Sequence, residues 1–146
     1  MADASGKLSM VNAGAGTEGT FAPDLDVAAG QQVQGIFHTH PYSAAEGGYT
    51  GVSLSGGDAA YMINEKQNVI IAQSGSEQFM YLRTQATPET VDFDALNDGQ
   101  NARMMELVNA GKSFSEASKV AAQETAVSHG LAYYSGTGGV FRRVSP

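Results

Sequence analysis

The spacing of apolar residues predicts strands and helices along most of the chain. A short strand is expected at 7–11, and the segment at 21–27, which Pro23 interrupts, is at best an edge strand. The apolar run at 33–40 predicts a longer strand. It leads into a loop at 41–56 that is rich in serine, glycine and alanine. A loop of this length is unusual unless it has a function.

Beyond this loop, the pattern predicts a short helix and a β-hairpin. Residues 58–65 have helical spacing, with apolar side chains on one side. Two β-rich runs follow at 68–72 and 78–83, with Ser-Gly-Ser between them. We expect both runs to pair with the strand at 33–40.

The last third of the chain is mostly helical in pattern, beginning at about residue 97. A helix is expected at 101–109, where Gly111 ends it. Ser113 and Glu116 have the spacing of a capping box and open a second helix, which runs to Gly130.

A terminal hairpin completes the predicted fold. Its strands are expected at 131–134 and 140–144, on either side of the glycines at 136–139. These elements predict an α+β domain, with a small mixed sheet flanked by helices, and with two helices and a hairpin at the C-terminus. We expect residues 1–146 to form one domain, with a helical and hairpin part at about 97–146.

Composition narrows the range of functions. The chain has 146 residues, of which 42% are hydrophobic, so it can bury the core of one domain. A net charge of −7 argues against binding to nucleic acids or anionic membranes. There is no apolar stretch near the ~18 residues of a membrane span. The chain has no cysteine, so any metal site must use His, Asp or Glu.

The tripeptide His38-Thr39-His40 ends the expected strand and holds two of the three histidines of the chain. Side chains alternate between the two faces of an extended segment, so both imidazoles point the same way, with Cα atoms roughly 6.5 Å apart. That placement suits two ligands of one metal ion. A hydrolytic site needs at least one more protein ligand and an open position. Asp58, at the far end of the loop, is the expected third ligand.

The motif His38-Thr39-His40-Pro41, followed by Ser55-x-x-Asp58, resembles the signature of the JAMM/MPN metalloprotease family. The resemblance covers about residues 5–85 and implies a JAMM/MPN-like (cytidine-deaminase-like) fold. It implies that His38, His40 and Asp58 bind Zn²⁺ and that Ser55 helps to hold the oxyanion. The implied reaction is hydrolysis of a peptide or isopeptide bond in a protein or peptide substrate.

The chain departs from the family pattern in two places. Thirteen residues separate Pro41 from Ser55, so the loop carries an insertion, which chain entropy tolerates. The loop carries Tyr42 and Tyr49, which we expect to bind substrate. The second departure concerns the Glu that, in the family, precedes the histidines and takes the proton of the water. Either Asp3, which holds the nearest matching place, is this base, or the boundary of the chain has cut the base off or replaced it.

The glycine-rich chain with its two-helix, Tyr-Tyr-containing tail also resembles the JAB-like domains at the C-termini of bacterial polymorphic and Rhs-type toxins. That resemblance implies a toxin or effector domain of a bacterial secreted protein, delivered into a target cell as part of a larger protein; otherwise the protein is expected to be cytoplasmic. It also implies a cognate immunity or inhibitor protein.

Two other functions are considered beside the metalloprotease. A cupin also uses His-x-His followed by Glu, and Glu46 follows His40, but a cupin needs another His from a later strand. The only later one, His129, is expected at a helix end, where it would complement the helix dipole. The other alternative is a catalytically impaired MPN-like module that acts by binding.

Overall fold

The computed structural model describes residues 28–42 and 47–144. The strands predicted at 7–11 and 21–27 lie outside the described residues. Within the described part, the order of elements is one strand, one helix, a hairpin, two helices and a second hairpin. The α+β class predicted from the sequence is therefore confirmed.

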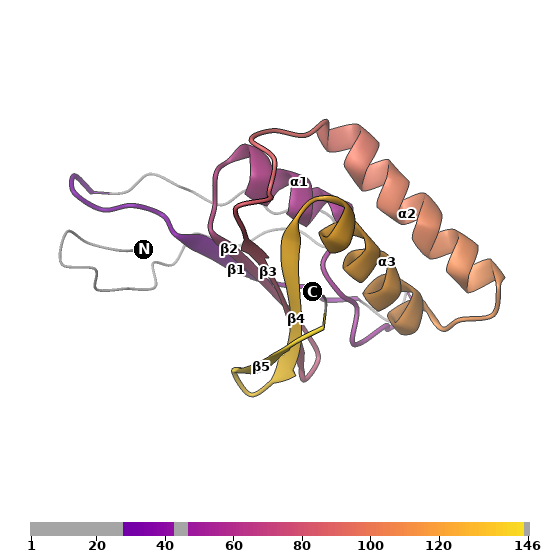
Figure 1. Cartoon of the computed structure of the whole chain (residues 1–146). Helices are drawn as coiled ribbons and strands as arrows, with labels where there is room; N and C mark the ends of the chain where they lie inside the picture. The colour runs from indigo at the N-terminus through magenta and orange to yellow at the C-terminus, as the bar shows by residue number, and fades with distance from the viewer. Residues whose placement is uncertain (1–27, 43–46, 145–146) are drawn as a thin grey trace.

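Five strands of the described chain form one mixed sheet, in the order β1-β2-β3-β4-β5 (Figure 1). The first strand pairs in parallel with the second, and every other pairing is antiparallel. The strands are β1 (Gly35–Thr39), β2 (Val69–Ser74), β3 (Glu77–Arg83), β4 (Leu131–Thr137) and β5 (Val140–Arg143).

The three helices of the described chain are α1 (Gly56–Asn64), α2 (Phe93–Asn109) and α3 (Phe114–Ser128). Helix α1 is the crossover that the parallel pair β1 and β2 requires. Helices α1 and α3 contact the sheet, while α2 packs on both helices and lies outermost (Figure 1).

One hydrophobic core lies between the sheet and the helices. Strand β2 buries Ile70 and Ala72, and β3 buries Phe79 and Tyr81, because alternate residues of a strand face the same side. Tyr81 lies against α3, where its hydroxyl donates to the carbonyl of Ala122 at 2.9 Å. The remaining residues of this core are Leu54, Ala59, Ala60, Met62, Ile63, Leu96, Ala122, Ala126, Leu131 and Tyr133.

The expected pairing of the first hairpin is only half right. Strand β2 pairs with β1, but β3 pairs with β2 and β4. Strand β2 has two edges, which β1 and β3 occupy, so β2 separates β3 from β1.

Helix α2 starts earlier than the sequence predicted, at Phe93 instead of residue 101. Asp92 caps it, since the Asp92 side chain accepts a hydrogen bond from the Ala95 amide at 2.9 Å. The first two turns bury only Leu96 and Gln100, so they lack the apolar periodicity that marks a helix in sequence.

Strand β4 also exceeds its predicted length, because it continues through Gly136 to Thr137. The turn to β5 is therefore only Gly138 and Gly139, with φ of 59° and 80°. Such positive angles at both central residues are typical of a tight hairpin turn.

No helix of the described residues is both long enough and apolar enough to span a bilayer.

Candidate metal centre

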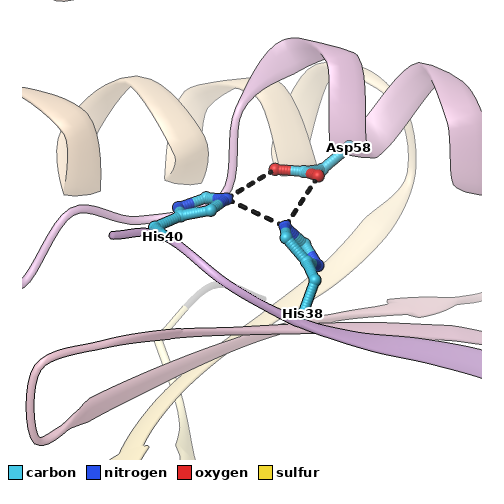
Figure 2. A group of neighbouring side chains, drawn as sticks. All are labelled: His38, His40 and Asp58. Atoms are coloured by element: carbon cyan, nitrogen blue, oxygen red, sulfur yellow. Dashed lines mark hydrogen bonds and ion pairs between the residues drawn. The ribbon is translucent and has the colours of Figure 1, made fainter. Parts of the chain in front are cut away.

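Three side chains named by the sequence motif meet at the carboxyl end of β1 (Figure 2). His38 is in the strand and His40 lies one residue beyond its end. The pleat turns both imidazoles to the side of the sheet that α1 covers, where Asp58 stands in the first turn of that helix. The expectation that the loop would return Asp58 to the two histidines is confirmed.

The three side chains are close enough to share one ion. Nε2 of His38 lies 2.8 Å from Nε2 of His40. The Asp58 carboxylate lies 3.0 Å from Nε2 of His38, through Oδ1, and 3.4 Å from Nε2 of His40, through Oδ2. Tetrahedral zinc with bonds of about 2.0–2.1 Å would place neighbouring ligand atoms about 3.3 Å apart. The donor set and its spacing therefore fit three corners of a zinc site.

The centre is largely enclosed, and its charges stabilise one another. The side chains of His38, His40 and Asp58 are 10%, 15% and 15% exposed. Burial alone would raise the pKa of Asp58, but hydrogen bonds and charge from the two histidines hold that pKa well below its usual range. The carboxylate is therefore ionised at neutral pH, which is the state that binds a cation.

His40 is affected by the same pair of opposing effects. Burial alone would lower the pKa of His40, but the hydrogen bond and charge of Asp58, with the backbone carbonyls of Val52 and Ser53, raise it overall. A metal ion would have to compete with this proton for His40, because only a neutral imidazole can bind a metal.

Ser55 and Asp58 form a capping box at the start of α1. Oγ of Ser55 accepts a hydrogen bond from the Asp58 amide at 3.0 Å. In return, Oδ2 of Asp58 accepts from the Ser55 amide at 2.7 Å and from its hydroxyl at 2.8 Å. These bonds fix the rotamer of Asp58 and occupy Oδ2. Oδ1 faces His38 and takes part in none of these hydrogen bonds, so it is the oxygen better placed to bind a metal.

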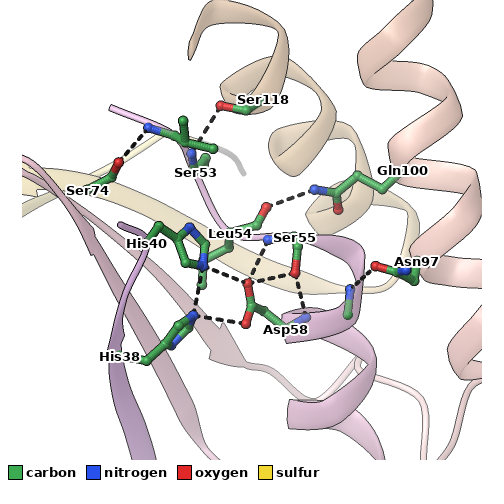
Figure 3. Close-up of polar contacts among 12 residues, drawn as sticks. His38, His40, Ser53, Leu54, Ser55, Asp58, Ser74, Asn97, Gln100 and Ser118 are labelled. Carbon is green, nitrogen blue, oxygen red and sulfur yellow. Dashed lines mark hydrogen bonds and ion pairs between the residues drawn. The ribbon is translucent and has the colours of Figure 1, made fainter. Parts of the chain in front are cut away.

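The chain from 51 to 55, here called the return segment, brings Asp58 back to the histidines. It is a coil, yet Val52, Ser53 and Leu54 are all buried. A buried coil needs partners for its backbone groups. The Val52 amide donates to Oγ of Ser74 at 3.0 Å, and the Ser53 amide donates to Oγ of Ser118 at 3.1 Å (Figure 3).

The outer helix α2 contacts the last part of the return segment and the first turn of α1. The Gln100 side chain donates from Nε2 to the Leu54 carbonyl at 2.8 Å (Figure 3). Oδ1 of Asn97 accepts from the Gly57 amide at 3.0 Å, in the first turn of α1. Helices α2 and α3 begin more than thirty residues after Asp58. Their side chains nevertheless hold the return segment and the helix start that position Asp58.

Sequence reasoning missed these supporting residues. Ser74, Asn97, Gln100 and Ser118 have no motif spacing, and each reads as an ordinary polar residue of a strand or helix. A glutamine on the buried side of a helix would be the one available signal. That side was not identifiable, because the start of α2 lacks apolar periodicity.

The two tyrosines expected to bind substrate lie together, and Phe114 joins them. The ring centroids of Tyr42 and Tyr49 are 6.1 Å apart, and Tyr49 stacks on Phe114 at 4.4 Å. Phe114 is the first residue of α3, and no pattern in the sequence indicated that it would lie beside the two tyrosines. Tyr49 remains 41% exposed, so the cluster has a face open to solvent.

Three other residues were considered from the sequence, namely Asp3, Glu46 and His129. Asp3 and Glu46 lie outside the described residues. His129 is the C-cap of α3, and its Nδ1 lies 3.0 Å from the carbonyl of Thr125, as expected for a residue that satisfies a helix end.

No protein-family model matches this chain, and no curated protein or solved structure matches it either. The described centre therefore stands on its own residues and geometry.

Proposed function

We propose that the protein is a zinc-dependent peptidase or isopeptidase of JAMM type. The observation that carries this proposal is the convergence of His38, His40 and Asp58, with all three ligand atoms within 4.8 Å of one another. Two imidazoles and one carboxylate leave a coordination position open, as in catalytic zinc sites. Zinc bound there would polarise a substrate carbonyl and lower the pKa of a coordinated water to about 7.

The protein residues around the ion have separate roles in this proposal. Asp58 neutralises charge and is fixed by its capping box. Ser55 is the oxyanion donor, and to act as one its hydroxyl must turn from Oδ2 of Asp58 to the carbonyl oxygen of the substrate. Asp3 is the general base that takes the proton of the attacking water.

The substrate in this proposal is a protein or peptide, bound partly by Tyr42 and Tyr49. Both rings follow His40 along the chain, and Tyr49 is 41% exposed. Large rigid rings supply contact area at low cost in conformational entropy. We further propose a toxin or effector domain of a secreted bacterial protein, with a cognate inhibitor protein; this part rests on the sequence resemblance alone.

The same centre would also serve a catalytically impaired module that binds zinc and acts only by binding. The cupin alternative has less support. A cupin is built on double-sheet β architecture, whereas the described chain supplies its ligands from one strand and the start of a helix in an α+β fold.

Metal analysis followed by a peptidase assay tests the proposal. We expect one zinc per chain, and little or none in His38→Ala. With zinc bound, the wild type should cleave peptide or isopeptide substrates, and Asp58→Ala should lose cleavage and most zinc. Hydrolysis that survives Asp58→Ala would contradict the assignment. Stoichiometric zinc with no hydrolysis of any amide substrate would instead favour the binding module.

A further inference from the structure

We propose that Gln100 and Ser118 are positioning residues for the metal centre. They hold the return segment, and through it Asp58, in the arrangement that would bind zinc. This inference rests on the proposed zinc function and extends it to two helices that contribute no ligand.

The return segment depends on these side chains because its sequence forms no regular structure. Its residues 52–54 are buried, so water cannot satisfy their amides and carbonyls. An unpartnered buried group of this kind costs about 1–3 kcal/mol. The segment would therefore move toward water, or toward other partners, if its hydrogen bonds from the helices were removed.

Movement of the return segment would reach Asp58 directly. Leu54, whose carbonyl Gln100 holds, is next to the N-cap Ser55, and Ser55 fixes the rotamer of Asp58. The segment is therefore continuous with the hydrogen bonds that orient Asp58.

Gln100 supplies the hydrogen bond that holds the Leu54 carbonyl. It is only 8% exposed, and its Nε2 donates to Leu54 while its Oε1 has no hydrogen-bond partner among the described residues. An apolar side chain of equal length would bury no such oxygen, but it would leave the Leu54 carbonyl without this donor.

Ser118 holds Ser53, the residue before Leu54 in the return segment. Its Oγ accepts from the Ser53 amide at 3.1 Å and donates to the Ser115 carbonyl of its own helix at 2.8 Å. Both hydrogen-bonding functions of the hydroxyl are thus used, and its direction is fixed. Removal of this hydroxyl changes one atom on a buried helix face, so Ser118→Ala should fold.

The test compares Gln100→Met and Ser118→Ala with the control variant Leu107→Ala. Leu107 is also buried and lies seven residues along α2 from Gln100, on the same face of the helix. Its truncation should lower stability without touching the return segment. Zinc affinity is measured by competition with a chromophoric chelator, and amide hydrogen exchange of residues 52–58 is measured without metal.

We expect Gln100→Met and Ser118→Ala each to weaken zinc binding about 10-fold or more, as outer-shell changes commonly do, and to speed exchange at 52–58. Leu107→Ala should do neither. Wild-type affinity and exchange in both variants, or equal effects in Leu107→Ala, would overturn the inference. Faster exchange with unchanged zinc affinity would also overturn it. If the wild type binds no zinc, the proposed function fails, and exchange alone decides whether the two side chains hold the segment.

Discussion

At the scale of single residues, Asp58 combines two roles that usually belong to different side chains. Its Oδ2 completes the capping box, and its Oδ1 faces the imidazole of His38. The two roles support each other, because a capped helix start is a rigid base for a metal ligand. The helix dipole adds to this, since the positive end of α1 favours an ionised carboxylate there.

Tyr133 gives a prediction about pH. Its hydroxyl lies 2.7 Å from Oγ of Ser53, in the return segment. Burial raises the pKa of Tyr133 to about 12, and the charge of Glu77 adds to the effect. An unfolded tyrosine has a pKa of about 10, so the folded state prefers the neutral phenol. The stability that Tyr133 contributes is thus complete below pH 10 and is lost as the pH rises through 12.

We therefore expect Tyr133→Phe to be about 1 kcal/mol less stable than the wild type at pH 8, because it loses a hydrogen bond. Above pH 10 this difference should fall, pass through zero and reverse, changing by about 2 kcal/mol near pH 12, since phenylalanine cannot ionise. Urea unfolding of both proteins between pH 8 and 11.5 measures the difference, and the other tyrosines cancel. A difference that stays constant would show that ionisation of Tyr133 is not coupled to folding.

At the scale of secondary structure, the sequence predicted an element correctly where the signal for it lay within a few neighbouring residues. The capping box at Ser113 and Glu116 placed the start of α3 correctly, because a cap involves only neighbouring residues. The His-x-His and Ser-x-x-Asp spacings likewise identified the three residues that converge.

Elements whose stability comes from tertiary contacts were predicted less well. The first turns of α2 exist because Asp92 caps them and because Leu96 and Gln100 pack on α1 and the return segment. Neither the hydrogen bond from Gln100 to Leu54 nor the contact of Phe114 with the two tyrosines could be predicted from the sequence. Both contacts depend on how the helices pack, and the pattern of apolar and polar residues along the chain does not predict that packing.

The contact between α1 and α2 gives a prediction with a neighbouring control. A Cβ at Gly56 would lie 2.6 Å from the Leu96 carbonyl oxygen and 2.8 Å from the Asn97 Cα, which are backbone atoms. Gly56→Ala should therefore push the two helices apart, costing about 1–3 kcal/mol, and should also weaken zinc binding by moving Asp58. Thermal unfolding and zinc titration measure these two effects.

Gly57→Ala is the matched control for that change. Its Cβ would meet side-chain atoms and no backbone, namely Oδ1 of Asn97 at 3.2 Å, Cζ of Phe93 at 3.4 Å and Oγ of Ser55 at 3.5 Å. These can shift, and alanine favours the helix, so stability and zinc affinity should stay near those of the wild type. Equal losses in both variants would mean that glycine is needed for backbone freedom and not for close packing.

At the scale of the whole molecule, the centre depends on both halves of the chain. The proposed ligands lie between residues 38 and 58. Their support comes from β4, α2 and α3, through Tyr133, Gln100 and Ser118. Zinc that binds the folded centre should therefore stabilise the whole domain, and not only the strand and helix that carry the ligands.

This coupling predicts a thermal shift. A ligand that binds only the folded state adds about 2.7 kcal/mol at a free concentration 100 times its Kd. For a domain of this size, 1 kcal/mol shifts Tm by about 2–4 °C, so zinc should raise Tm by about 5–10 °C in a single transition. His38→Ala should show no such rise at the same zinc concentration. A comparable rise in His38→Ala would place the stabilising zinc at another site, and two separate transitions in the wild type would show that the halves do not fold as one unit.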